Sequence, residues 1–247
     1  MMNDSASFTG HKFRQLDENF WKSLESSSFY FPDPVRLNDP ADCQIDLVKA
    51  FQLARAGQSA THAAKAEELF LRFANKVVEH AKTCGVYSLS CGSIAGDDER
   101  LLWAHYAANH TGVCLTFKIP YDFVSDNMVG VAPVEYSTDS LFGALRGIDL
   151  SKKPDFEQDI KPILTAYLTT KAPEWEYEHE ARFISFHSGL QELDRTWLKQ
   201  ICFGLRTSAA DRERVTQLAE NYPDCNLVEA VKSDDDLFRL TLREVAR

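Results

Sequence analysis

Two glutamates and an arginine stand at alternate positions in the stretch EWEYEHEARFISF, residues 174–186. If this stretch is a β-strand, Glu178, Glu180 and Arg182 share one face, with successive side chains about 7 Å apart. Two close carboxylates push their pKa values apart, which suits a division between an anion and a proton carrier. The same face continues into apolar residues, so the charges need a reason to be there. One interpretation is a catalytic pair. The other is a solvated sheet edge on which the arginine neutralises a glutamate.

Two serines form a second pair. The stretch VYSLSC, residues 86–91, has the alternation of a strand, so Ser88 and Ser90 share a face. Their hydroxyl groups could bind a ligand or brace Glu180. A serine pair on a half-buried strand also needs no ligand, and both interpretations stay open.

A helix is predicted for ERLLWAHYAANH, residues 99–110, ended by Gly112. His105 and Tyr106 share a face with Leu102 because residues three and four apart are neighbours on a helix. His105 is a candidate proton donor or stacking group. The alternative for His105 is a buried imidazole bonded to a backbone carbonyl. Trp103 lies on a different side of the helix. We expect both Trp103 and Tyr106 in the core, with a place beside the ligand as the alternative for Tyr106.

Arg14 and Asn38 complete the candidates. Arg14 lies on a predicted first strand, and its guanidinium fork could clamp a pyrophosphate. Asn38 and Asp39 precede Pro40 in a turn rich in proline and Asx residues, where they could reach a ligand or form an Asx turn. A surface arginine and a plain turn are the structural alternatives.

The elements that must position these residues mix strands and helices without strict alternation, which favours the α+β class. We expect a flexible arm over residues 1–10 and one domain over 11–247. That domain should hold a mixed, largely antiparallel sheet flanked by helices, among them helix 59–82, whose start Ser59 or Thr61 could cap.

Composition narrows the class of function. The chain has 247 residues and a formal net charge of −10, which argues against a broad nucleic-acid surface. No apolar run approaches the length of a membrane helix, and the N-terminus has no apolar signal region, so we expect a cytoplasmic protein without membrane partners. The 6 cysteines lack metal-ligand spacing and are interpreted as small buried hydrophobes, so no metal cofactor is expected.

Several of these motifs together resemble a bacterial family catalogued as domain of unknown function 2971. The resemblance spans roughly residues 11 to 205 and implies no activity. It rests on His11 to Arg14, Asn38-Asp39-Pro40, Ser88 and Ser90, Trp103-His105-Tyr106, Gly112, Trp175, Glu178-Glu180-Arg182 and Gly204.

A second resemblance carries chemistry. An arginine on a first strand, a Ser-x-Ser strand and a later Glu-x-Glu, in this order, are similar to the pattern of ADP-ribosyltransferase-like proteins. The resemblance implies a split sheet, NAD as the substrate and an unknown acceptor. It assigns Glu180 to the oxocarbenium-like ribose, Glu178 to the acceptor nucleophile and Arg14 to the pyrophosphate. The remaining candidates around the nucleotide are Ser88, Ser90, His105, Tyr106 and Asn38.

Two hypotheses of function follow. The first is an enzyme that cleaves the nicotinamide–ribose bond of NAD, as an ADP-ribosyltransferase or an NAD glycohydrolase. The second is a non-catalytic binding protein in a prokaryotic stress or phage-defence setting. Whether Ser88, His105 and Glu180 converge on one pocket discriminates between the two hypotheses.

Overall fold

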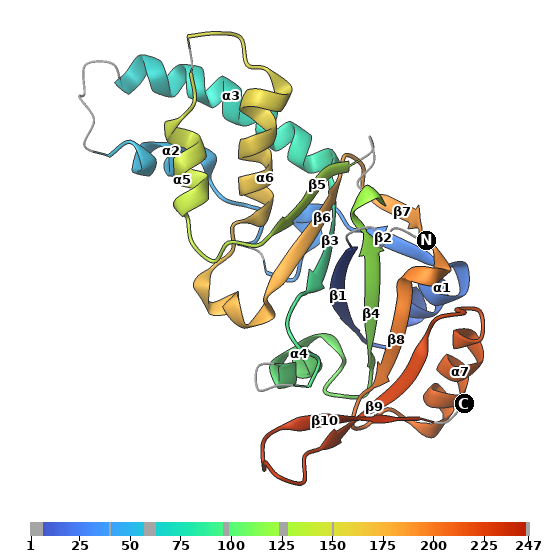
Figure 1. Cartoon of the computed structure of the whole chain (residues 1–247). Helices are drawn as coiled ribbons and strands as arrows, with labels where there is room; N and C mark the ends of the chain where they lie inside the picture. The colour runs from blue at the N-terminus through green and yellow to red at the C-terminus, as the bar shows by residue number, and fades with distance from the viewer. Residues whose placement is uncertain are drawn as a thin grey trace, which may run out of the picture.

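A large sheet organises the fold. The computed structural model describes residues 7–39, 41–56, 63–95, 99–123, 128–149 and 151–245. Within these residues the main sheet has eight strands (Figure 1). In spatial order they are β10 (Leu240–Glu244), β9 (Asn226–Lys232), β8 (Leu198–Phe203), β4 (Val113–Pro120), β1 (Ser7–Arg14), β3 (Gly85–Ser90), β6 (Glu180–Ser185) and β5 (Met128–Pro133).

Most neighbours in this sheet are antiparallel. The described exception is β8 with β9, whose parallel pairing follows from the crossover through helix α7 (Ala209–Ala219). Ser208 caps that helix by accepting a hydrogen bond from the backbone N–H of Asp211. The α+β class and the largely antiparallel sheet flanked by helices are therefore confirmed.

The sheet forks between β1 and β3. Strand β1 pairs with β4 along its whole length, and β3 does the same with β6. Between β1 and β3, however, the described residues form one pair, His11 with Ser90. Beyond that pair the two strands diverge and leave an opening inside the sheet.

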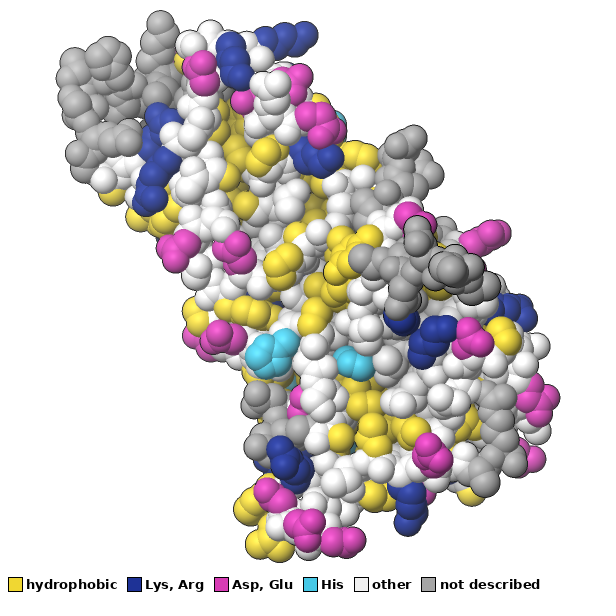
Figure 2. Space-filling view, viewed as in Figure 1, with side chains coloured by type: hydrophobic (Ala, Val, Ile, Leu, Met, Phe, Trp, Pro, Cys, Tyr) yellow, Lys and Arg dark blue, Asp and Glu magenta, His cyan; other side chains and the backbone are white. Residues whose placement is uncertain are grey.

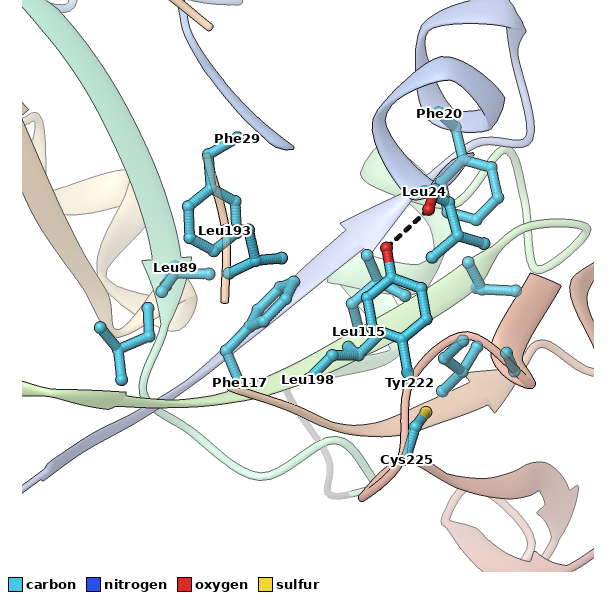
Figure 3. Close-up of a cluster of buried hydrophobic side chains, with 14 of the residues drawn as sticks. Phe20, Leu24, Phe29, Leu89, Leu115, Phe117, Leu193, Leu198, Tyr222 and Cys225 are labelled. Carbon is cyan, nitrogen blue, oxygen red and sulfur yellow. Dashed lines mark hydrogen bonds between the residues drawn. The ribbon is translucent and has the colours of Figure 1, made fainter. Parts of the chain in front are cut away.

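One hydrophobic cluster fills the face of the sheet that carries α1 (Glu18–Ser26), α7 and a two-stranded sheet of β2 (Ser28–Phe31) with β7 (Gly189–Glu192). Figure 3 shows Phe29, Phe117 and Leu198 in this cluster. The hydroxyl group of Tyr222 donates a hydrogen bond of 2.6 Å to the carbonyl of Leu24, so its polar end is satisfied within the core.

A second cluster lies in a group of helices beyond β5 and β6 (Figure 1). The helices are α2 (Leu47–Ala54), α3 (Ala63–Thr83), α5 (Asp139–Arg146) and α6 (Lys161–Thr169), which a π-helical turn (Phe156–Ile160) precedes. Phe51 stacks on Phe70 with ring centroids 3.9 Å apart, which ties α2 to α3. The segment that follows α6 leads from this group of helices to the fork.

Helix α4 (Glu99–Tyr106) packs over the fork on the opposite face from α1. Trp103 is fully buried against Phe13, with ring centroids 5.1 Å apart, as expected for a core residue. The turn after α4 needs Gly112, because a Cβ there would lie 2.1 Å from the carbonyl oxygen of Arg14. Gly112 therefore allows the close packing that places the end of β1.

The stretch that holds Glu178 differs from the expected strand. Residues Pro173–Glu178 form a 3₁₀ helix, and His179 follows in the left-handed region with φ 45°. Strand β6 begins only at Glu180, so the expectation that Glu178 shares a strand face with Glu180 was wrong. The interpretation as a solvated edge was also wrong, because β6 lies between β3 and β5 and is buried along its length. The part of it that has the arginine neutralise a glutamate is confirmed, since Arg182 pairs with Glu180.

Other boundaries shift by a few residues. Strand β1 begins at Ser7, earlier than the expected His11, and residues 1–6 lie outside the described residues. The proposed caps Ser59 and Thr61 lie outside them as well. Five of the six cysteines are buried as expected, whereas Cys91 is exposed.

Candidate functional site

A pocket of about 860 Å³ lies at the fork between β1 and β3. Ser88, His105 and Glu180 all contribute to its wall, so the three side chains that were to discriminate between the hypotheses lie along one pocket. The other sequence candidates line the same pocket, namely Glu178, Ser90, Arg14, Tyr106 and Asn38.

The pocket reaches both faces of the sheet through the fork. His11 pairs with Ser90 and Ser90 pairs with Glu180, so these three side chains share one face. Lys12 and Arg14 follow the opposite alternation of β1 and lie toward α1. We call the first side the carboxylate arm, made by Asp42, Tyr106, Lys171, Glu178, Glu180 and Arg182, and the second the basic arm, made by Lys12, Arg14 and Lys22.

Glu180 is held by two cations at the floor of the carboxylate arm. Arg182 donates to both of its oxygens at 2.7 and 3.1 Å, and Lys171 donates to Oε2 at 3.0 Å. Burial by itself raises the pKa of Glu180, but the charges of Arg182 and Lys171 outweigh burial and lower it to about 2. Glu180 is therefore an anion at neutral pH.

Arg182 links Glu180 to a third carboxylate. Its guanidinium donates to both oxygens of Asp42, at 2.9 and 2.6 Å, and to the carbonyl of Leu168 at 2.6 Å. Arg182 is 1% exposed. A buried cation of this kind is tolerated because its donors find charged partners, and removing one partner leaves an uncompensated charge.

Glu178 has the opposite tendency. Tyr106 donates its hydroxyl proton to Oε1, and Lys171 donates to Oε2. Burial raises the pKa of Glu178 more than these two partners lower it. Although Glu178 is not on the strand, its carboxylate meets that of Glu180 at the ammonium group of Lys171. The structure thus pairs one stable anion with one carboxyl group that takes up a proton more readily.

The loop before Asp42 closes this arm. Asn38 donates to the hydroxyl oxygen of Tyr106 at 3.0 Å. Asp39 accepts a hydrogen bond from the indole of Trp175 at 2.8 Å and also from the backbone N–H of Ala41, which is an Asx turn. Asn38 therefore reaches the pocket, whereas Asp39 has the structural role.

His105 lies at the rim rather than in the interior. The residue is exposed, and its ring centroid lies 6.5 Å from that of Trp175 and 6.4 Å from that of Tyr177. The alternative of a buried histidine bonded to a carbonyl was wrong. These rings make an aromatic rim beside the carboxylate arm.

The basic arm has a different chemistry. Lys12 donates to the backbone carbonyl of Ser88 at 2.7 Å across the fork, and burial together with the charge of Arg14 lowers its pKa to about 8. Arg14 lies 3.6 Å from Asp17. The hydroxyl-bearing residues of this arm are Ser23, Ser26, Ser28 and Tyr30. Cations and hydroxyl groups of this kind suit a phosphorylated ligand.

Sequence reasoning missed Lys171, Asp42 and Lys12. Lys171 and Asp42 lie in irregular segments, where no periodicity marks a buried charge. Lys12 is a polar position on a strand that reads equally well as solvent-facing. Their signal is visible only in three dimensions, as buried charges that face one another.

The described residues also bear on metal binding and on membrane insertion. No group of three or more His, Cys, Asp and Glu side chains among them could hold a metal ion. No helix in the described part of the chain is long and apolar enough to cross a membrane. On the face seen in Figure 2, lysines and arginines are interspersed with acidic side chains.

Comparison with known proteins gives one match. Residues 102–183 match the model of a family described as protein of unknown function (DUF2971), which supports the family resemblance. The matched segment runs from α4 to β6 and includes Tyr106, Lys171, Glu178, Glu180 and Arg182. No curated protein and no solved structure matches the chain.

Proposed function

We propose that the pocket binds NAD and that the protein cleaves the nicotinamide–ribose bond as an ADP-ribosyltransferase-like enzyme. The observation that carries the proposal is the pairing at the fork. Ser90 lies directly opposite Glu180 on adjacent strands, and Arg14 lines the same pocket from the other side of the opening. The arginine, the Ser-x-Ser and the Glu-x-Glu follow one another in the chain and also lie along one pocket, which supports the proposal.

Glu180 would act on the ribose. When the C1′–N bond breaks, its electron pair leaves with neutral nicotinamide and positive charge develops on the ribose. A fixed anion stabilises that charge without reorganisation at the moment of reaction. The low pKa of Glu180, which Arg182 and Lys171 maintain against burial, keeps it ionised for this role.

Glu178 would serve the acceptor. The acceptor's lone pair forms the new bond to C1′, and the proton that it loses passes to the Glu178 carboxylate. Its raised pKa suits a proton carrier better than that of Glu180. The acceptor is a protein, a nucleic acid or water, and His105 and the aromatic rim lie where it would approach.

The basic arm would hold the rest of the nucleotide. Arg14 offers a planar fork to a pyrophosphate, Lys12 lines the same arm, and Arg36 lines the pocket. A dinucleotide placed this way would run from the carboxylate arm through the fork.

One observation favours a second candidate, a non-catalytic nucleotide-binding protein in a prokaryotic stress or phage-defence setting. The carboxylate of Glu180 is already engaged by Arg182 and Lys171, and the residue is 6% exposed. A purely structural ion network has the same appearance. Under this candidate the pocket binds nucleotide but the glycosidic bond remains intact.

The test is nicotinamide release from NAD by purified protein, with and without added acceptors, measured by chromatography. Glu180→Gln should lower the rate at least 100-fold. Glu229→Gln, which changes a glutamate of the same sheet far from the pocket, should leave the rate unchanged. NAD binding by calorimetry without release would favour the binding protein. If the protein neither binds NAD nor releases nicotinamide, the proposal is refuted.

A further inference from the structure

Lys171 stands between the two carboxylates of the site. It follows α6 and is 6% exposed. Its ammonium group donates to Glu178 and to Glu180, and lies 3.9 Å from Asp42. The indole ring of Trp175 covers it with the ring centroid 4.9 Å from Nζ. Nothing in the sequence pattern or in the two resemblances assigns this residue a role.

We propose that Lys171 is the positioning residue that separates the roles of the two carboxylates. Its ammonium group holds Glu180 as an anion and orients the Glu178 carboxyl group toward Tyr106. This inference rests on the proposed function, which it deepens.

The charges around Lys171 explain why one cation does both tasks. Three carboxylates meet here, and in the described residues Arg182 and Lys171 are the cations bonded to them directly. Glu180 has two contacts from Arg182, whereas Glu178 has Lys171 as its bonded cation. The titratable and charged groups that face the pair are Lys12, Asp42, Cys43, Cys91, Tyr106, Tyr136, Tyr177 and Arg182.

Loss of Lys171 would therefore change the surroundings of Glu178 more than those of Glu180. Glu180 would keep Arg182, but Glu178 would retain only the hydrogen bond from Tyr106 in a buried position. A buried carboxyl group without a cation takes up a proton. Both carboxylates would then shift to higher pKa, and Glu178 would shift further.

A lysine suits this position better than an arginine. Its ammonium group is compact and has three donors, enough for two carboxylates that approach from different directions. The indole face of Trp175 occupies a further side through a cation–π contact. A guanidinium group is planar and larger, so Lys171→Arg should keep the charge but misplace the donors.

The first test is the pH profile of nicotinamide release for wild type, Lys171→Met and Lys171→Arg. Removing the cation should move the acidic limb of kcat upward by at least one pH unit in Lys171→Met. Lys171→Arg should lower kcat but leave that limb within half a unit of wild type. Lys199→Met, which breaks an exposed pair with Asp224, is the matched control and should move neither quantity. An unmoved limb in Lys171→Met would overturn the proposal.

A second test needs no activity. In Lys171→Met the folded Glu178 should hold a proton that the unfolded chain, with a pKa near 4.5, releases. Stability must then fall as pH rises above 4.5, so the unfolding constant of this variant relative to wild type should be about tenfold greater at pH 8 than at pH 5.5. Lys171→Met/Glu178→Gln should remove the difference.

Urea denaturation measures these constants. If Lys171→Met unfolds outright, recovery of folding by adding Glu178→Gln would still support the assignment, and no recovery would refute it. A protein that never releases nicotinamide but shows this pH-dependent stability would refute the catalytic proposal alone. In that case Lys171 would still control the two carboxylates.

Discussion

Two glutamates of the same sheet are each held by two cations, yet they lie in very different surroundings. Glu180 in β6 has a side chain that is 5% exposed, and its partner Arg182 is 1% exposed. Glu229 in β9 is bonded to Arg212 and Arg243 at 2.7 Å each, but its side chain is 17% exposed and that of Arg243 is 67% exposed. The contacts are alike in length and differ in access to water.

The difference in exposure shows that the buried network around Glu180, rather than the exposed one around Glu229, needs an explanation. An exposed pair contributes about 0–1 kcal/mol and forms wherever long charged side chains meet. A buried network carries a desolvation cost that apolar residues of the same volume would avoid. The network around Glu180 faces a pocket, and the one around Glu229 does not line it. A costly buried network beside a pocket is consistent with a functional role.

The largest loss of stability is expected from a substitution that breaks the buried network. Arg182→Met leaves Glu180 and Asp42 without their shared cation, and the free energy of unfolding should fall by about 3–5 kcal/mol. Arg243→Met should cost less than about 1 kcal/mol because water replaces the lost cation. Urea denaturation of both variants measures the contrast, and equal losses would contradict it.

The second-largest difference between the two glutamates should be in how their contributions to stability depend on low pH. The folded pKa of Glu180, about 2, is below its ordinary 4.5, so its contribution is present above pH 4.5 and is lost as pH falls toward 2. We expect the stability difference between wild type and Glu180→Gln to shrink by about 2–3 kcal/mol across this window. For the more exposed Glu229 the same comparison with Glu229→Gln should change far less.

A smaller effect should come from the loop that closes the carboxylate arm. Trp175→Phe removes the indole donor to Asp39 and should lower the free energy of unfolding by about 1–2 kcal/mol. Asp39→Asn keeps one of the two oxygen acceptors that Asp39 uses, for the indole of Trp175 and for the backbone N–H of Ala41, so it should cost about as much. No measurable loss in either variant would show that these hydrogen bonds do not hold the loop.

Salt gives the smallest contrast. Raising the salt concentration to 1 M shortens the Debye length to about 3 Å and screens exposed pairs. The small cost of Arg243→Met should then vanish, whereas that of Arg182→Met should persist. Denaturation curves at low and high salt check this, and parallel screening of both would mean that water reaches Arg182.

Much of the fold followed from periodicity, because strands such as β4 and β8 alternate or are continuously apolar and helix α3 has a regular stripe. The start of β6 did not, because the left-handed turn before it is at His179, where no glycine marks it in the sequence. Strand β7 has four residues, too few periodic positions to be distinguished from loop. Helix α2 was not predicted although Leu47, Ala50, Phe51 and Ala54 have helical spacing and Asp46 caps its start.

The sequence predicted some of the residues that line the candidate site, but not the contacts among them. Residue types and spacing singled out Glu178 and Glu180, since acidic groups beside apolar strands are conspicuous, and strand alternation singled out Ser88 and Ser90. Lys171 and Asp42 were not singled out, because their burial depends on contacts between segments more than a hundred residues apart. Which carboxylate keeps its proton is likewise a property of the assembled cluster.

The fork has a consequence for the sheet itself. Because His11 and Ser90 form the single described pair between β1 and β3, both strands have open edges although they lie in the middle of the sheet. Exposed edges recruit other chains, and proteins often protect them with lysine. Lys12, which donates across the gap to Ser88, occupies such a place. A ligand in the fork would thus bridge β1 and β3 where the two strands are not paired. Its binding should slow amide hydrogen exchange along both strands.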